Sequence, residues 1–163
     1  MFYPFNQINS RVYHFITDES VLYHVSFSLE EVDMALDAEI SSTIFNIILA
    51  PIDSKKGGKK DDKIGKTVFN IICDFESQNP NCCFTYTADF FDGRQHLRNR
   101  FFNMWIDSYG KETYHAINLD IHHVTIGETY YSTLLYNVAY TYEKQVSKAF
   151  EEKIMYYQAV KAG

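Results

Sequence analysis

One segment near the middle of the chain combines charged side chains with a helical pattern. It runs from Asp89 to Trp105 and reads DFFDGRQHLRNRFFNMW. At about 100° per residue, a helix over 94–109 places Arg94 and Arg98 in the same sector as its apolar side chains. The apolar members of that sector are Leu97, Phe101, Phe102 and Trp105. A guanidinium on a core-facing stripe needs a negative partner, because burying a lone charge is costly.

Two interpretations of these arginines remain open. In the first, Arg94 or Arg98 forms an ion pair that ties the helix to the sheet, as buried charges usually do. The candidate partners are Asp74, Asp89 and Asp92. In the second, the Gly93 amide, the start of the helix and both guanidinium groups bind a small anion, a phosphate or a carboxylate. An enzyme built on that pocket would use Asp89 or Asp92 as its acid/base group.

No other segment predicts a catalytic site. Gly65-Lys66-Thr67 ends like a phosphate-binding loop, but Lys60 stands where that motif requires a glycine. The chain has no G-x-S-x-G motif, and Cys73 has no histidine near it in the sequence. We therefore assign no catalytic residue and expect no cofactor.

Metal ligands are also too few in any one place. Asp120 and His122 share one face of an expected strand, whereas His123 points to the other face. Further ligands would have to come from His115, or from distant histidines such as His14 and His24, and no spacing brings these together. We expect no bound metal.

Tyrosines gather in the segment from Thr129 to Tyr142. Tyr130 and Tyr136 face one side of an expected strand, and Tyr131 faces the other. Tyrosine is typical of protein interfaces, because its ring is rigid and amphipathic, but it is equally typical of sheet surfaces. These three residues therefore form a candidate interface for a homo-oligomer or a protein partner.

The charge balance argues against nucleic-acid binding. Fifteen Lys and Arg against 21 Asp and Glu give a formal net charge of −6, whereas phosphate binding needs a basic footprint. The exception is the Lys-, Gly- and Asp-rich stretch 53–63, which we expect to form a flexible loop. Its aspartates dilute the positive charge of its lysines.

The sequence carries no sign of a membrane or secreted protein. No apolar run approaches the ~18–20 residues of a membrane span, and the start of the chain lacks a basic signal-peptide region. Cys73, Cys82 and Cys83 form an odd set with an adjacent pair, which is a poor disulfide framework. We expect reduced cysteines and a cytoplasmic location.

The elements that must position these residues follow from periodicity. Strands are expected at 11–17, 21–29, 41–50, 82–88, 114–124 and 129–136. Helices are expected from Asp61 or Asp62 to Asn79-Pro80, at 94–109 and at 138–160, with a further helical turn or two at 30–38. The order βββαβαββα over 163 residues predicts one α+β domain, 1–163, in which two to three helices pack on a mostly antiparallel sheet of about six strands.

The arginine-bearing segment also resembles a known family. The motif in this segment, which we call the arginine thread, consists of Asp89, Asp92-Gly93-Arg94-Gln95, Arg98-Asn99-Arg100, Phe101-Phe102 and Trp105. This thread resembles small bacterial proteins, mostly from Bacteroidetes, that are grouped as a domain of unknown function. The opening hairpin and the helix ending at Asn79-Pro80 fit too, so the resemblance covers most of the chain. The sequence departs from the family at Ala88-Asp89, where a cysteine–aspartate pair is expected. The resemblance implies a single domain and an important arginine-rich helix, and it implies no activity.

These observations favour a non-catalytic module that acts by binding, either through self-association or to a protein partner. One alternative is a small anionic-ligand binder, or an enzyme, at the Arg/Asp pocket. A third is a weak nucleic-acid binder that uses the lysine-rich loop.

Overall fold

The computed structural model describes residues 1–29, 36–52, 61–88, 93–123 and 127–162. The strands are β1 (Phe5–Asn9), β2 (Val12–Ile16), β3 (Leu22–Leu29), β4 (Ile44–Pro51), β5 (Cys83–Ala88), β6 (Tyr114–His123) and β7 (Glu128–Asn137). The helices are α1 (Ala38–Ser41), α2 (Asp62–Gln78), α3 (Gln95–Trp105) and α4 (Glu143–Ala162), with a π-helical turn, η1 (Ile106–Gly110), directly after α3.

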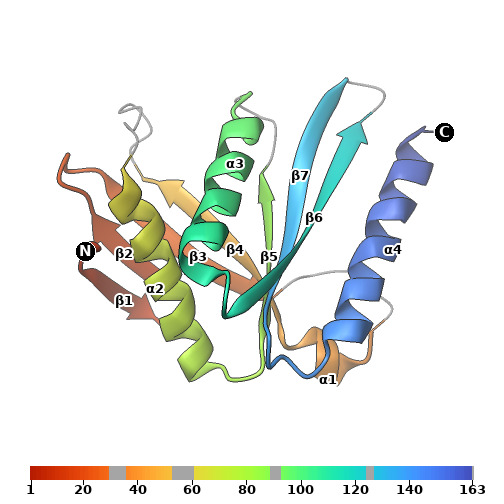
Figure 1. Ribbon diagram of the computed structural model, residues 1–163, viewed down its shortest axis with the longest axis horizontal. Helices are drawn as coiled ribbons and strands as arrows, with labels where there is room; N and C mark the ends of the chain where they lie inside the picture. The colour runs from red at the N-terminus through yellow and green to blue at the C-terminus, as the bar shows by residue number, and fades with distance from the viewer. Residues whose placement is uncertain (30–35, 53–60, 89–92, 124–126, 163) are drawn as a thin grey trace.

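All seven strands join one sheet in the order β1-β2-β3-β4-β5-β7-β6 (Figure 1). Every neighbouring pair is antiparallel except β4 and β5, which run parallel and are connected through α2. A parallel pair needs such a crossover, because the chain must return to the end of the sheet where it started. The predicted α+β class with a mostly antiparallel sheet is confirmed, with one strand and one short helix more than expected.

The expected starts of the last helix and of the strand at 41–50 are wrong. The last helix begins at Glu143 and not at 138, because Asn137 organises a turn first: its Oδ1 accepts the Ala139 N–H (2.9 Å) and its carbonyl accepts the Tyr140 N–H (2.9 Å). The strand expected at 41–50 starts at Ile44, because α1 extends to Ser41 and the N–H groups of Ser42 and Thr43 still bond back to carbonyls of α1.

The expected loop 53–63 and the expected helical turns at 30–38 are only partly described. Residues 53–60 and 30–35 lie outside the described residues. The predicted end of the loop at residue 63 is wrong, because α2 already begins at Asp62. Asp61 caps it as expected, and its Oδ1 accepts the Lys63 N–H at 3.0 Å.

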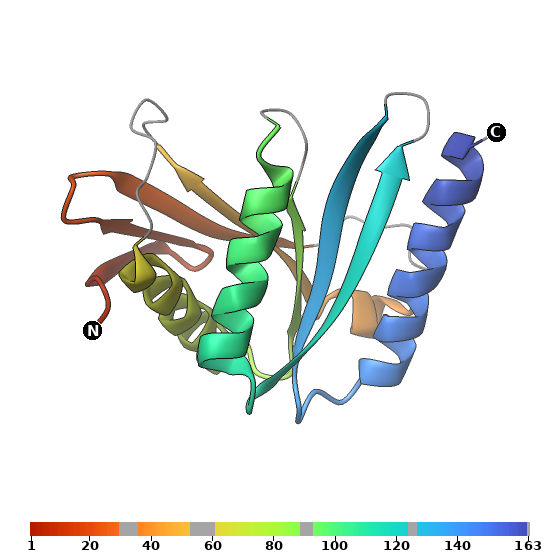
Figure 2. The same ribbon diagram turned by 45° about the horizontal axis from the view of Figure 1, so that its top comes forward.

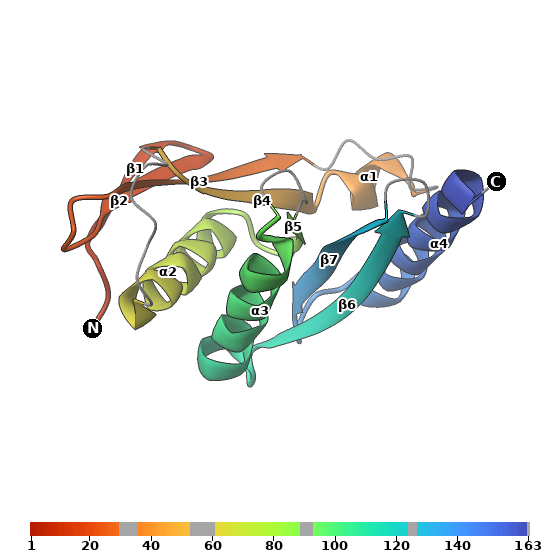
Figure 3. The same cartoon turned by 90° about the horizontal axis from the view of Figure 1, so that it is seen from above.

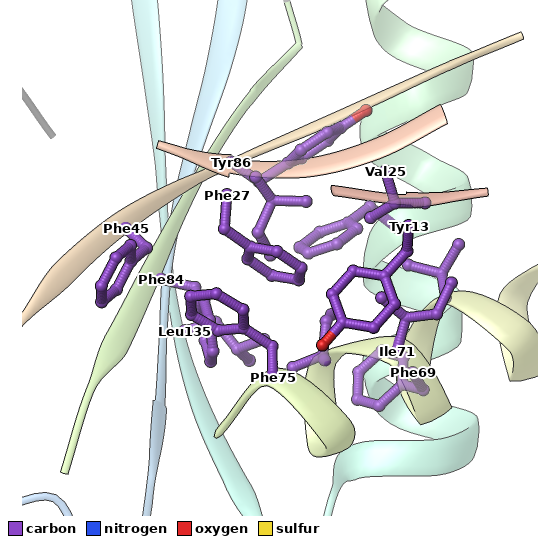
Figure 4. Close-up of a cluster of buried hydrophobic side chains, with 14 of the residues drawn as sticks. Tyr13, Val25, Phe27, Phe45, Phe69, Ile71, Phe75, Phe84, Tyr86 and Leu135 are labelled. Carbon is purple, nitrogen blue, oxygen red and sulfur yellow. The ribbon is translucent and has the colours of Figure 1, made fainter. Parts of the chain in front are cut away.

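Helices α2 and α3 cover one side of the sheet, which we call the inner face (Figure 3). Along α2, apolar side chains recur at helical spacing, and Val68, Ile71, Ile72 and Phe75 are completely buried. The Phe75 ring stacks on Phe27 of β3, with centroids 4.0 Å apart, and meets Phe84 of β5 at 6.1 Å (Figure 4). The main hydrophobic core therefore lies between α2, α3 and strands β2–β5 and β7.

Helix α4 covers the opposite side of the sheet at the end that holds β6 and β7 (Figure 2), and its cluster reaches the first residues of β4 and β5. Val146 and Phe150 of α4 bury Ile44, Cys83 and Leu134 in a second, smaller cluster. Among the described helices, none has the length and apolar content that a membrane span needs.

The glycine of Gly65-Lys66-Thr67 serves helix packing. A Cβ atom at Gly65 would lie 2.3 Å from Cδ1 of Trp105, so only glycine lets α2 approach α3 this closely. The buried Thr67 hydroxyl accepts the Tyr3 N–H (2.9 Å) and donates to the Lys63 carbonyl (2.6 Å). Both residues therefore have structural roles, in keeping with the missing phosphate-binding motif.

Gly65→Ala should lower the free energy of unfolding by about 1–3 kcal/mol, because the added methyl group overpacks the contact with Trp105. Urea denaturation measures the change. In a Trp105→Leu background the same substitution should be neutral or stabilising, since alanine favours a helix over glycine by roughly 0.5–1 kcal/mol. An equal loss in both backgrounds would show that the indole is not the obstacle.

Candidate functional site

The first candidate site is the start of α3, where the sequence predicts an anion pocket. Gly93 precedes the helix with φ +71°, a backbone region that side chains with a Cβ rarely adopt. Arg94 is the N-cap residue, and its side chain makes no cap hydrogen bond. Helix N-termini favour anions because their N–H groups and dipole point outward. Asp89 and Asp92, the predicted acid/base candidates, lie outside the described residues.

The expected inward orientation of both arginines is only partly right. Arg94 is exposed and Arg98 is half-buried, while Leu97 is 50% exposed. The helix is rotated by its strongest contacts: Phe102 stacks on Tyr86 at 4.2 Å, and Trp105 packs against Gly65. These contacts turn Arg94 and Leu97 toward water, although neither arginine is without an interaction partner.

Gln95 is a residue of this site that the charge pattern did not single out. Its side chain is only 2% exposed, and its Nε2 donates to Glu128 Oε2 at 3.1 Å. Its Oε1 is buried and has no hydrogen-bond partner in the described structure. An unpaired buried acceptor typically costs about 1–3 kcal/mol. The available signal was spacing, because Gln95 lies two helical turns before the buried Phe102.

The tyrosines that form the predicted interface all contact their own chain. The Tyr131 hydroxyl shares a hydrogen bond with Nδ1 of His96 on α3. Burial, and then the charge of Asp120, raise the pKa of Tyr131 above its ordinary value. Tyr136 packs into the cluster under α4, and Tyr130 is half-buried. An interface through these residues stays a prediction.

The second candidate site lies on the side of the sheet opposite α2 and α3. Alternation and strand register place ten side chains of β2, β3 and β4 there, and we call them the outer face. They are Val12, His14, Ile16, Leu22, His24, Ser26, Ser28, Asn46, Ile48 and Ala50. None of the ten is charged, and Ile16 and Ile48 are 59% and 45% exposed. No described helix covers this part of the sheet (Figure 3).

A histidine pair occupies the middle of the outer face. His14 and His24 are direct cross-strand partners in β2 and β3. Their rings lie 5.2 Å apart between centroids, and His14 Nε2 is 3.1 Å from His24 Nδ1. The neighbouring cross-strand pairs are Val12 with Ser26 and Ile16 with Leu22.

A family model described as a family of unknown function, DUF6169, matches residues 60–152. This range covers more than half of the 163 residues. The chain belongs to the DUF6169 family. The expected membership in a family of unknown function is thereby confirmed. No curated protein and no solved structure matches the chain.

The matched range divides the two candidate sites of this DUF6169 protein. It runs from the start of α2 into α4 and includes Gly93, Arg94, Gln95 and Arg98. Strands β1–β4, with the outer face, precede it. The start of α3 therefore lies within the family domain, whereas the outer face lies in the part of the chain before the match.

The described lysines and histidines of the other predicted sites have local partners. Lys63 Nζ lies 2.6 Å from Asp18 Oδ2, and Lys66 Nζ lies 5.8 Å from the centroid of the Tyr109 ring. His122 Nδ1 is 3.0 Å from the Thr129 hydroxyl. Within one copy, the described residues contain no group of three or more potential metal ligands.

Gln95→Met should change the free energy of unfolding by less than about 1 kcal/mol, because the lost bond to Glu128 is offset by removal of the unpaired oxygen. Thr67→Val is the matched control, since both hydrogen bonds of that buried hydroxyl are made, and it should cost about 1–3 kcal/mol. Urea denaturation compares the two. A loss for Gln95→Met as large as that for Thr67→Val would mean that the amide oxygen is satisfied.

Proposed function

We propose that this DUF6169 protein is a non-catalytic module that self-associates, with the outer face of one copy packed on the outer face of a second. One observation carries this proposal: ten neighbouring side chains on three strands include no Asp, Glu, Lys or Arg. In the whole chain 22% of residues are charged. Depletion of charge is the compositional mark of interface cores.

The net charge favours this face over the rest of the surface. Two copies that each carry a formal charge of −6 repel one another. Contact through an uncharged surface keeps the charged side chains of the two copies apart. It also leaves those side chains hydrated, so no charged group has to be desolvated. Burial of Ile16 and Ile48, both exposed in one copy, would add apolar contact at about 25 cal/mol per Å².

The outer face is also chemically able to pair with itself. Its polar groups are hydroxyls, an amide and imidazoles, each of which can both donate and accept hydrogen bonds. A two-fold interface brings the same patch together twice, so each group must suit a copy of itself. A patch of single-sign charge fails that requirement, whereas the outer face meets it.

The proposed setting is a bacterial cytoplasm, as the sequence resemblance and cysteine pattern imply. All three cysteines are free thiols. Cys82 is buried, and burial, with the nearby Glu76 carboxylate, raises the pKa of its thiol to about 12. The Cys82 thiol is therefore inert in any compartment, whereas Cys73 is an exposed free thiol, which suits a reducing compartment.

Ile48→Lys should weaken the dimer at least about 100-fold, because each of the two copies would bury a lysine without a partner. Sedimentation velocity in EDTA measures the mass, which for the wild-type dimer is twice the chain mass of 19.1 kDa. Leu97→Lys is the control, since Leu97 is 50% exposed on α3, on the other side of the sheet. A dimer that survives Ile48→Lys, or a wild-type monomer, contradicts this function.

A second candidate function is the binding of a phosphate-type anion at the start of α3. The buried Oε1 of Gln95 favours it, because that atom has no hydrogen-bond donor among the residues that the structure describes. Hydrogen phosphate and phosphate monoesters bring both a hydroxyl that donates and oxygens that accept from helix N–H groups and Arg98. In this arrangement Gln95 would take the hydroxyl, and Arg94 and Arg98 would neutralise the charge.

Inorganic phosphate at about ten times its Kd should stabilise the wild-type protein by about 1.4 kcal/mol in thermal unfolding. Arg98→Met should abolish this gain while leaving the fold intact. Arg11→Met is the matched control, because Arg11 is exposed and lies next to β2, near the Phe45 ring. A gain that persists in Arg98→Met, or no gain in the wild type, removes this candidate.

A further inference from the structure

We propose that His14 and His24 form half of a binding site for a divalent transition-metal ion of the zinc class, and that the ion joins two copies of the chain. The inference deepens the proposed self-association, on which it rests, by naming what sits at the centre of the interface. It departs from the expectation of no metal, because the strand register places these two histidines side by side as direct cross-strand partners.

The spacing of the two nitrogen atoms suits one metal ion. Two ligands on a tetrahedral zinc, with Zn–N distances of about 2.0–2.1 Å, stand about 3.4 Å apart. His14 Nε2 and His24 Nδ1 are 3.1 Å apart, so a small rotation of the rings lets both reach the same ion. Imidazole nitrogen is a preferred ligand of zinc, copper and nickel.

The protons also balance. In the metal-free pair, one of the two facing nitrogens, His14 Nε2 or His24 Nδ1, donates a hydrogen bond and the other accepts it. When both nitrogens bind metal, each neutral ring holds its proton on its other nitrogen, Nδ1 of His14 and Nε2 of His24. Binding therefore requires one ring to change tautomer through solvent and leaves both rings neutral.

One copy alone supplies an incomplete site. No third His, Cys, Asp or Glu of the described chain joins the pair, whereas structural zinc sites have four protein ligands. A two-fold axis through the middle of the outer face would bring a second His14–His24 pair opposite the first. Sheets that pack face to face lie about 10 Å apart, which leaves room for one layer of imidazoles from each copy and an ion between them.

The surroundings of the pair favour an ion held at an interface. Along the row, His14 is paired with Asn6 of β1 and His24 with Ala50 of β4. The rows on either side contribute Val12, Ser26, Ile16 and Leu22. None of these residues brings a lysine or arginine that would repel a cation, and the aliphatic ones exclude water once covered, which strengthens metal–ligand bonds.

The test measures zinc binding and mass on the same purified full-length chain, first in EDTA and then with zinc chloride after removal of the chelator. Isothermal titration with Zn²⁺ should give one ion per two chains. Sedimentation velocity should show the dimer dissociation constant falling at least about tenfold when zinc is present. His14→Gln and His24→Gln should each abolish both effects, while His122→Gln, an exposed histidine on β6, should change neither.

The outcomes separate this inference from the proposed function. A dimer in EDTA that Ile48→Lys breaks, but that neither binds zinc nor responds to it, overturns the metal site and leaves self-association standing. One ion per chain without a change in mass, or binding that survives His14→Gln, also overturns the bridging site. A chain that is monomeric under all conditions overturns both.

Discussion

The packing of α2 on the inner face of the sheet is the constraint on which the rest of the structure depends. Phe75 lies between Phe27, Phe45 and Phe84, so a single helix residue joins three strands. Because side chains alternate along a strand, burying one set against α2 turns the other set outward in the same register. The uncharged outer face and the position of its histidine pair therefore follow from how α2 sits on the other side.

Much of the fold could be predicted because its signals are local. The apolar stripe from Ile64 to Phe75 predicted α2, alternation predicted β3 and β6, and β-branched and aromatic residues predicted β2. Strand β1 was not predicted. Four of its five residues are exposed at the sheet edge, so its sequence FNQIN carries no burial pattern. Residues 138–142 share the apolar spacing of α4, but Asn137 bonds to the backbone of the turn and delays the helix to Glu143.

The candidate sites depend on tertiary contacts and were less predictable. The rotation of α3 is decided by Tyr86 and Gly65, which come from other elements, so a helical wheel alone placed Arg94 on the wrong side. Gln95 is a polar residue in the first turn of α3, and its spacing of two turns from Phe102 is a weak local signal of its burial. The pairing of His14 with His24 was within reach, since a turn centred on residue 19 between the two strands implies it.

The parallel seam between β4 and β5 has a consequence for how the chain acquires this structure. Strands β1–β4 follow one another as a meander, and β6–β7 form another adjacent pair, so each can assemble from neighbouring sequence. The parallel pairing of β4 with β5, in contrast, joins Ile44 to Cys83, which are far apart in the sequence with α2 between them. Contacts between distant residues slow folding. During synthesis strands β1–β4 leave the ribosome before α2. The apolar side chains of their inner face therefore stay exposed to solvent until residues 62–78 have been made.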